Sequence, residues 1–414
     1  MSDAAPTIAP IAERLLGGPL PVRLCAWDGS EAGPLDAPRV LLNSPRAVRR
    51  LLWQPGELGL AEAYISGDLD VEGELTDALR VVWHALRERS ATAAPPRVTL
   101  ATRARAAARA ARLGVIGPPP SAPGGHHHVL LSEFYERLLD PSMAYSCAYW
   151  TSHDPSYGLA DAQRDKLEVI CRKLALVPGA RLLDIGCGWG ALALYAADRH
   201  KAQVTAVTSV PEERDFVRER VDELGLGQFV EVVLSDYRDL DGGMYEAVAC
   251  VETGERVGHD QYPRLTRTLH GMLRPGGRAL VQQMSRAPGT PGGGAFIETY
   301  VAPDLHMRPL GETIGLLEAA GLEVRSSESL REHYVRTVGA WREALESQWD
   351  AFRLLTGDHT ARMWRLCLAG GALAFEERRM GIDQILAVRP TARGVSGMPD
   401  TPTDWYPAPA LEAA

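Results

Sequence analysis

The sequence predicts an α/β protein built on a doubly wound, parallel sheet, and two observations lead to this prediction. First, an apolar strand at residues 180–185 runs into a glycine-rich turn at 186–190, and an Ala/Leu-rich helix follows at 191–199. Second, strand and helix patterns then alternate, over 203–207, 212–224, 230–234, 247–251, 261–273 and 278–282. Such alternation is typical of a parallel sheet with helices on both faces.

The glycine-rich turn is the first candidate for a binding site. Gly186, Gly188 and Gly190 stand at alternate positions in Asp-Ile-Gly-Cys-Gly-Trp-Gly. Glycines at this spacing allow a tight turn and let a ligand lie against the backbone with no Cβ in the way. Asp184 stands at the carboxyl end of the strand, where open α/β sheets bind ligands. A tight strand-to-helix turn also needs glycine for steric reasons alone, so the motif leaves a purely structural explanation open.

The loops after the next two strands suit a nucleoside. Folds of this class place ribose-binding groups on the loop after the second strand, which here carries Thr208, Ser209 and Glu213. Asp236 and Tyr237 follow the third strand, where an acid beside an aromatic ring can hold an adenine.

Composition excludes several classes of protein. Its 45% hydrophobic and 23% charged residues are those of a globular protein, and the net charge of −9 argues against a nucleic-acid binder. The six cysteines are scattered without a Cys-x-x-Cys motif, which suits a reducing cytosol. We expect no signal peptide, no membrane span and no metal site, since the adjacent histidines 126–128 cannot all face one ion.

Longer motifs carry a resemblance to a known family. Residues 184–190 resemble motif I of the class I S-adenosylmethionine-dependent methyltransferases. The run Leu-Asp-Pro-Ser-Met-Ala-Tyr-Ser-Cys-Ala-Tyr-Trp at 139–150 resembles one branch, the cyclopropane-fatty-acyl-phospholipid synthase family. Further matching stretches are 61–73, 134–135, 236–240, 255–258 and 331–334, with Thr337 and Trp341. The resemblance implies a class I methyltransferase Rossmann-like sheet with a small mixed α+β N-terminal domain.

Four segments follow from the composition and the resemblance. We expect an N-terminal lipid-facing or accessory domain at 1–90, a linker at 91–125, the methyltransferase domain at 126–390 and a disordered tail at 391–414. Within the linker, residues 100–113 form either a basic helix that touches anionic lipid or an ordinary solvated helix. Its four arginines are Arg103, Arg105, Arg109 and Arg112. A long helix over 338–355 carries an apolar stripe that we assign to core packing and to the wall of an acyl tunnel.

The resemblance also implies the residues of the site. S-adenosylmethionine would be held by Tyr145, Ser146, Asp184, Gly186, Gly188, Trp189, Gly190, Thr208, Ser209, Glu213, Asp236 and Tyr237. Methyl transfer to an alkene leaves a carbocation, which needs a dry, aromatic site and a base that removes a proton. In the family that base is a bicarbonate ion, and its cradle here would be Cys147, Glu255, Gln282, the Met284 backbone and Tyr334. Tyr149 and Trp150 add to the aromatic residues marked by the motifs.

Three residues depart from the family's pattern, namely Glu213 in place of glutamine, Arg256 in place of histidine and Gln282 in place of a histidine. Glu252 together with Glu255 resembles a second version of the motif, which makes Glu252 another catalytic candidate.

The expected function is methyl or methylene transfer from S-adenosylmethionine to the double bond of an unsaturated acyl chain in phospholipid, giving a cyclopropane or a methylene or methyl branch. The expected partners are the phospholipid bilayer surface, unsaturated acyl chains and a second copy in a homodimer. The expected location is the cytoplasm, on the inner face of the membrane. Two alternatives stay open: a methyltransferase acting on a small unsaturated metabolite, and a non-catalytic subunit that binds lipid or S-adenosylmethionine.

Overall fold

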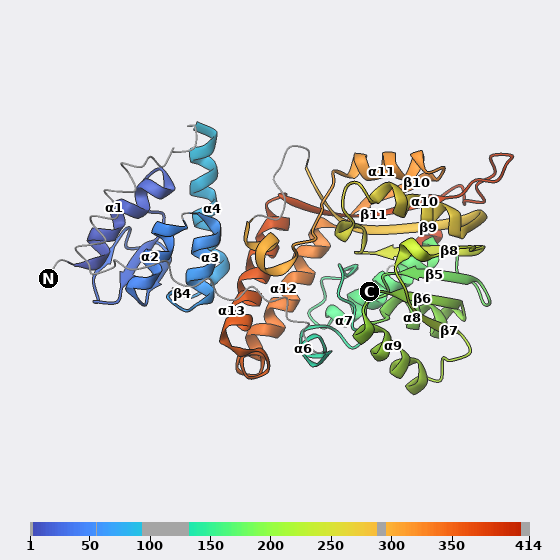
Figure 1. Cartoon of the computed structure of the whole chain (residues 1–414), viewed down its shortest axis with the longest axis horizontal. Helices are drawn as coiled ribbons and strands as arrows, with labels where there is room; N and C mark the ends of the chain where they lie inside the picture. The colour runs from blue at the N-terminus through green and yellow to red at the C-terminus, as the bar shows by residue number, and fades with distance from the viewer. Residues whose placement is uncertain (1–2, 55, 93–131, 288–294, 407–414) are drawn as a thin grey trace, which may run out of the picture. The chain divides into compact units, whose positions relative to one another are not determined.

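The structure is a computed structural model that describes residues 3–54, 56–92, 132–287 and 295–406 (Figure 1). The chain divides into two compact units. Unit 1 comprises Met1–Val129, Gly293–Pro303 and Leu345–Leu373, and unit 2 comprises Leu130–Gly292, Asp304–Ala344 and Ala374–Ala414. Two segments from the second half of the chain thus belong to the same unit as the N-terminal region. The sequence analysis did not predict this, because it divided the chain into consecutive segments.

Unit 2 contains a seven-stranded sheet in the order β10-β11-β9-β8-β5-β6-β7. Its strands are β5 (Arg181–Ile185), β6 (Gln203–Thr208), β7 (Val230–Leu234), β8 (Tyr245–Val251), β9 (Leu273–Arg286), β10 (Glu323–Ser329) and β11 (Met380–Val388). The five neighbouring strands β9, β8, β5, β6 and β7 all run parallel to one another. β11 runs antiparallel to both of its neighbours, β9 and β10. The strand order reverses between β5 and β8, and open α/β sheets bind ligands at such a switch point.

Helices cover both faces of this sheet, as predicted. They are α7 (Leu159–Lys173), α8 (Ala191–His200) and α9 (Pro211–Glu223) on one face, and α10 (Tyr262–Met272) and α11 (Leu310–Ala319) on the other. Unit 2 also contains α6 (Ser132–Leu138) and most of α12 (Arg331–Ser347). Leu182 belongs to the core beneath α7, α8 and α9, whereas the next residue, Leu183, belongs to the core beneath α10 and α11. Because successive strand residues point to opposite faces, a strand buried on both sides reads as a continuous apolar run.

Unit 1 has its own sheet, in the order β2-β1-β3-β4, and its own core. Its elements are α1 (Ala4–Leu16), β1 (Arg23–Ala26), β2 (Glu31–Ala32), β3 (Arg39–Leu42), α2 (Pro45–Trp53), α3 (Glu57–Ile65), β4 (Leu69–Glu72), α4 (Leu75–Thr92) and most of α13 (Trp349–Glu376). Phe296, Tyr300 and Leu366 are buried in the same core as the N-terminal segment. The N-terminal region is therefore the predicted mixed α+β domain, completed by residues from far along the chain.

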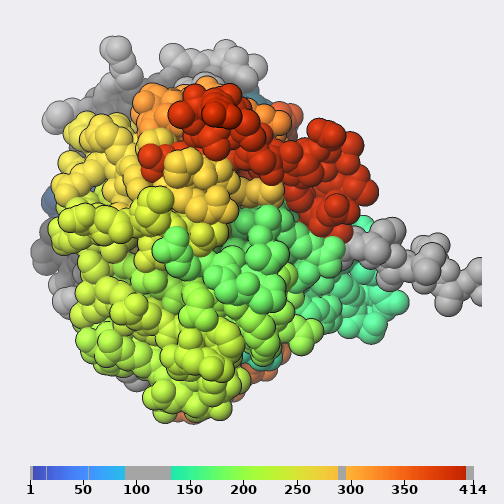
Figure 2. Space-filling view, turned by 90° about the vertical axis from the view of Figure 1, so that its right-hand side faces the viewer, coloured from blue at the N-terminus to red at the C-terminus, as the bar shows by residue number. Residues whose placement is uncertain are grey.

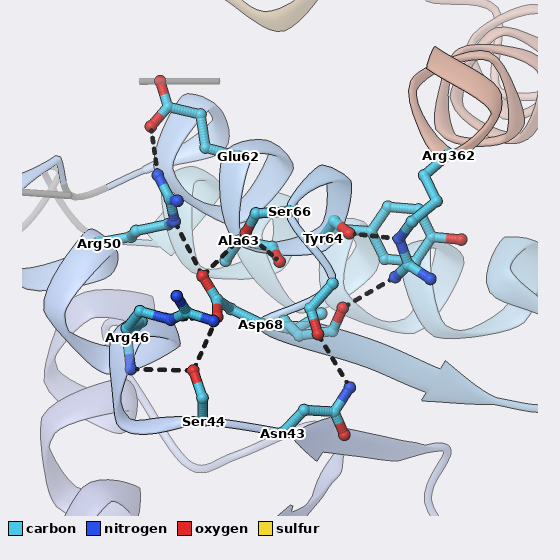
Figure 3. A network of polar contacts seen from close by, with 12 residues as sticks. Asn43, Ser44, Arg46, Arg50, Glu62, Ala63, Tyr64, Ser66, Asp68 and Arg362 are labelled. Carbon is cyan, nitrogen blue, oxygen red and sulfur yellow. Dashed lines mark hydrogen bonds and ion pairs between the residues drawn. The ribbon is translucent and has the colours of Figure 1, made fainter. Parts of the chain in front are cut away.

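A polar network lies inside unit 1 (Figure 3). The buried Asp68 carboxylate accepts hydrogen bonds from Ser44 Oγ at 2.7 Å and Ser66 Oγ at 2.9 Å, and it forms an ion pair with Arg50. Burial works against the charge of Asp68, but these donors hold its pKa below the usual value. Arg362 of α13 stacks on the Tyr64 ring, 4.2 Å from its centroid. The network satisfies its charges internally, so we assign it to the stability of the unit.

Two predicted segments differ from the structure. The helix expected over 338–355 is interrupted at Gln348, so its apolar stripe is divided between α12 and α13; Gly357, with φ 81°, interrupts α13 again. Residues 391–406 were expected to be disordered, but Trp405 is buried and Tyr406 OH donates to Glu328 at 3.1 Å. Burial of one large aromatic ring holds this Pro-rich segment in place (red in Figure 2), beside residues from the beginning of unit 2.

The predictions for the linker, its basic helix and histidines 126–128 lie outside the described residues. Among the helices that the structure describes, none is long and apolar enough to cross a bilayer. All six cysteines are unpaired.

Candidate active site

The glycine-rich turn lies at the carboxyl end of β5, and its three glycines serve different purposes. A Cβ on Gly186 would collide with the Thr253 side chain, and a Cβ on Gly190 would lie 2.9 Å from Val217. Only Gly188, with φ 52°, faces open space. The structural explanation therefore accounts for two of the glycines, and Gly188 is the one that leaves room for a ligand.

Asp184 precedes this turn and is 2% exposed. Its Oδ2 atom has no hydrogen-bond partner among the described residues. Burial raises the pKa of Asp184 to about 7, although the Lys166 ammonium works in the opposite direction. A buried carboxylate oxygen without a donor is costly, so this atom is suited to accept a hydrogen bond from a ligand in the turn.

The predicted ribose and adenine residues follow β6 and β7 along the same edge. Thr208 Oγ1 donates to Glu213 Oε2 at 2.5 Å, and burial raises the pKa of the Glu213 carboxyl. Asp236 accepts three hydrogen bonds from Arg238, through the backbone N–H and two guanidinium nitrogens. Ser209 is exposed. Most of the predicted cofactor residues thus follow β5, β6 and β7, with Ser209 exposed, whereas Tyr145 and Ser146 lie in the segment between α6 and α7.

Aromatic rings line up between the glycine turn and α12. Tyr135 contacts Trp189 at 5.3 Å and Tyr145 at 5.4 Å between ring centroids, and Tyr145 contacts Trp341 at 5.2 Å. Trp341 then meets Tyr334 at 5.9 Å. This row supplies the apolar, electron-rich lining that a carbocation needs.

Two of the predicted aromatic residues lie elsewhere. Tyr149 OH donates to Glu328 and its ring stacks on His333, while Trp150 lies beneath the Arg336 guanidinium. Tyr149 and Trp150 therefore pack this loop against β10 and α12 and do not line the site.

Three of the five predicted cradle residues, Cys147, Gln282 and Tyr334, converge on Glu252, the first residue after β8. Glu252 Oε1 accepts from the Cys147 backbone N–H at 2.7 Å and from Gln282 Nε2 at 2.9 Å. Glu252 Oε2 accepts from Tyr334 OH at 2.8 Å. Glu252 itself adopts a left-handed backbone conformation with φ 50°, an uncommon and strained state for glutamate that recurs at functional sites.

Glu255, which the sequence analysis placed in the cradle of the base, is 2% exposed, and neither of its carboxylate oxygens has a side-chain hydrogen-bond partner among the described residues. Burial, and next the charge of Glu252, raise the pKa of Glu255 to about 8. Burial also raises the pKa of Glu252, but Cys147, Gln282 and Tyr334 oppose that shift. Three donors bond to the Glu252 carboxylate, while the backbone N–H groups of Glu255 and Met284 lower the pKa of Glu255 by less than burial raises it. The negative charge of the pair therefore resides on Glu252 near neutral pH.

A lysine that the sequence analysis missed balances this charge. Lys166 of α7 is 2% exposed, and its ammonium donates to Ser146 Oγ at 2.8 Å. Burial lowers the pKa of Lys166, while Glu252, Asp140, Cys147 and Asp184 raise it. The signal was present in the sequence, because Lys166 lies on the helical face shared by Ala162 and Ile170, where a charge is unusual.

Comparison with known proteins decides the family. Residues 121–385 match the model of the family described as mycolic acid cyclopropane synthetase. This chain belongs to that family. It is 36% identical over 398 residues to a probable fatty acid methyltransferase of Pseudomonas putida, covering 94% of this chain and 96% of that protein.

Two other relatives of the enzyme have more specific names. It is 32% identical to a tuberculostearic acid methyltransferase of Mycobacterium tuberculosis, across 92% of this chain and 91% of that protein. It is 31% identical to the cyclopropane-fatty-acyl-phospholipid synthase of Escherichia coli, across 66% of this chain and 69% of that protein. Among solved structures, the mycolic acid cyclopropane synthase CmaA1 with SAH and CTAB matches with a TM-score of 0.59 and 25% identity, over 63% of this chain and 95% of that one. The enzyme is an S-adenosylmethionine-dependent methyltransferase.

The residues present fit S-adenosylmethionine, because Asp184 offers an unpartnered oxygen beside the open Gly188. They do not fit a separate bicarbonate in the same way. Cys147, Gln282 and Tyr334 already direct their donors at the Glu252 carboxylate, a planar anion that offers them two oxygen atoms.

Proposed function

We propose that this enzyme transfers the methyl group of S-adenosylmethionine to the double bond of an unsaturated fatty acyl chain in phospholipid, and that Glu252 removes the proton that completes the reaction. The observation that carries this proposal is the convergence of Cys147, Gln282 and Tyr334 on the Glu252 carboxylate.

S-adenosylmethionine supplies an electrophilic methyl carbon. The π electrons of the alkene form the new bond to that carbon, the carbon–sulfur bond breaks, and its electron pair stays on sulfur. A cation remains on the neighbouring alkene carbon, where the row of rings from Tyr135 to Tyr334 stabilises it. Glu252 then accepts a proton and becomes a neutral carboxylic acid, which the buried site favours.

The fate of the cation decides the product. Loss of a proton from the new methyl group with ring closure gives a cyclopropane, whereas a hydride shift followed by proton loss gives a methylene branch. We propose the methylene branch as the product, because the relatives that match more than nine-tenths of this chain are named methyltransferases of fatty acids. A saturated methyl branch would require a further hydride donor, and the proposed reaction ends at the methylene.

We propose that Glu252 takes the place of bicarbonate. A carboxylate that receives the three donors leaves no need for a diffusible base. Product formation by the enzyme in buffer depleted of carbon dioxide is therefore expected to match that in buffer with added bicarbonate. A rate that rises with bicarbonate concentration would assign proton removal to the ion instead.

We further propose that the enzyme works in the cytoplasm at the inner membrane surface, because its acyl substrate resides in the bilayer. The basic segment 100–113 supports this proposal through its four arginines, each of which contributes about 1 kcal/mol near an anionic surface. A homodimer stays a prediction.

The test uses vesicles of unsaturated phospholipid and S-adenosylmethionine labelled at the methyl group, with the acyl products identified by mass spectrometry. We expect label in a methylene-branched acyl chain. Label in a cyclopropane would correct the product alone, and label only in added small unsaturated metabolites would overturn the phospholipid proposal.

A further inference from the structure

A row of polar side chains crosses three neighbouring strands of unit 2 inside the protein. Gln282 of β9 and Gln384 of β11 are register partners, and Glu328 of β10 is the register partner of Gln384 on its other side. Gln282 and Gln384 are buried, at 0% and 1% exposed. Lys173, at the end of α7, brings a cation that is 1% exposed to the same row. Buried polar groups on this scale need complete hydrogen bonding to be tolerated.

Hydrogen bonds connect this row to the site without a break. Lys173 Nζ donates to Gln384 Oε1 at 2.7 Å, and Gln384 Nε2 donates to Gln282 Oε1 at 2.9 Å. Gln282 Nε2 then donates to Glu252 Oε1 at 2.9 Å. The chain therefore begins at an ammonium group and ends at the carboxylate that accepts the proton.

The direction of every bond in this chain is fixed at both ends, because the Glu252 carboxylate and the Cys147 carbonyl, which both accept from Gln282 Nε2, have acceptors only. An ammonium group has donors only, so Gln384 must turn its oxygen to Lys173 and its nitrogen to Gln282. Gln282 must then turn its oxygen to Gln384 and its nitrogen to Glu252. Without Lys173, the Gln384 amide loses the cation that fixes its orientation and can rotate. The Gln282 oxygen then faces an oxygen instead of a donor, which works against the orientation in which Gln282 donates to Glu252.

We propose that Lys173 and Gln384 are positioning residues, which hold Gln282 in the one orientation that donates to Glu252 and so keep this carboxylate charged and in place for proton removal. This inference rests on the proposed role of Glu252. Neither residue contacts the site, and both act through Gln282.

The charged groups around the chain set its pH dependence. Glu252 faces Lys166, Tyr334, Cys147 and Glu255, and the Gln282 hydrogen bond is among those that lower its pKa. At the other end, Lys173 forms an ion pair with Glu328 at 2.6 Å and lies 5.3 Å from the centre of the Tyr406 ring. Burial lowers the pKa of Lys173 and Glu328 opposes that shift, so the ion pair keeps the ammonium protonated.

Losing the Gln282 donor leaves the carboxylate of Glu252 less well solvated, which raises its pKa. Because the base works only when it is ionised, the acidic limb of the turnover profile moves to higher pH. We expect a shift of about one pH unit for Gln384→Leu and Lys173→Met, the size that follows from one hydrogen bond to a charged group. The KM for S-adenosylmethionine should stay unchanged, because neither residue touches the glycine turn.

The matched control is Gln283→Leu. Gln283 is the next residue of β9, is 2% exposed and bonds to Tyr262 and Thr313 on the opposite face of the sheet. Its replacement removes a buried amide of the same kind without touching the chain. Thermal unfolding should therefore show a similar loss for Gln283→Leu and Gln384→Leu, while only Gln384→Leu moves the pH profile.

A measurement without substrate separates this inference from the proposed function. In protein labelled with ¹³C at glutamate Cδ, the Glu252 signal is the one absent from Glu252→Gln, and its shift with pH reports its titration. We expect a higher midpoint in Gln384→Leu and Lys173→Met and the parental midpoint in Gln283→Leu. Parental midpoints in both chain variants, folded by circular dichroism, would overturn the inference, whereas failure of the parent to modify lipid would overturn the proposed function alone.

Discussion

Glu255 is a buried carboxyl group beside the charge of Glu252, and this has a measurable consequence for stability. Its pKa is raised from an ordinary value of 4.5 to about 8, so the folded protein binds more protons than the unfolded chain between these two values. Stability therefore falls as pH rises through that window. Glu255→Gln should remove this cost and stabilise the protein at pH 8 by about 1–3 kcal/mol, with little effect at pH 4.5. Chemical denaturation at both pH values measures the difference, and equal gains at both would contradict it.

Asp184 supplies the second prediction at this scale. Asp184→Ala should weaken S-adenosylmethionine binding by about tenfold or more, because the ligand loses an acceptor in a buried turn. Isothermal titration calorimetry measures the affinity. Asp236→Ala is the comparison, since its carboxylate is already occupied by Arg238 and should contribute less. If Asp184→Ala bound S-adenosylmethionine with the parental affinity, the assignment of the cofactor site to this turn would be wrong.

At the level of single residues, the sequence identified the participants of the site but not their connections. Cys147, Gln282, Tyr334 and Glu252 were all candidates, but spacing along the chain cannot reveal that the first three donate to the fourth. The left-handed backbone of Glu252, which turns its carboxylate toward them, leaves no mark on the sequence because glutamate rarely adopts it. Gln384 was missed for a related reason, since a polar residue in an apolar strand shows its purpose only through its cross-strand partner.

Among the elements, α13 contributes most of its length to unit 1. Arg362 donates to the Tyr64 and Leu69 carbonyls and forms an ion pair with Asp70 at 3.0 Å. Arg362→Met should lower the free energy of unfolding by about 1–3 kcal/mol, because it leaves these acceptors without their donor. Arg353→Met is the control, since the Arg353 ion pair with Asp358 is exposed. Urea unfolding compares the two variants, and equal effects would show that Arg362 contributes no more than a surface pair.

The C-terminal segment provides another prediction for an element. Trp405 is 8% exposed, and Arg172 NH1 donates to the next carbonyl, that of Tyr406. Trp405→Ala should lower stability by about 2 kcal/mol, because it exposes the apolar surface that the ring covers. Thr401→Ala is a control on the exposed part of the segment. If the unfolding midpoint of Trp405→Ala were unchanged, residues 391–406 would be disordered, as their composition predicts.

Most elements of the sheet were predictable because their patterns are local. β5, β6, β7, α8 and α9 were placed within about two residues by apolar periodicity and turn glycines. In unit 1, β2 and β4 were missed: β2 has only two residues, and β4 alternates apolar residues with acids directly after a helix. The interruption between α12 and α13 was missed since the apolar stripe continues across it.

For the whole molecule, two groups of residues share one edge of the unit 2 sheet. The cofactor residues follow β5, β6 and β7, and the groups that handle the proton come from β8, β9 and α12, on the other side of the switch point. This division lets an acyl chain meet the methyl donor on one side and the base on the other. The family's pattern names candidates in both halves, and two of its three departures, Arg256 and Gln282, lie in the second half, where we propose that Glu252 serves as the base.

The turnover of Glu252→Gln tests this central claim most directly. Initial rates on unsaturated phospholipid vesicles should fall by about 100-fold or more, because glutamine cannot accept the proton, while calorimetry shows parental affinity for S-adenosylmethionine. Glu255→Gln, three residues away and buried in the same loop, should keep most of the parental rate. Near-parental turnover by Glu252→Gln together with loss of turnover in Glu255→Gln would contradict the account and return proton removal to Glu255.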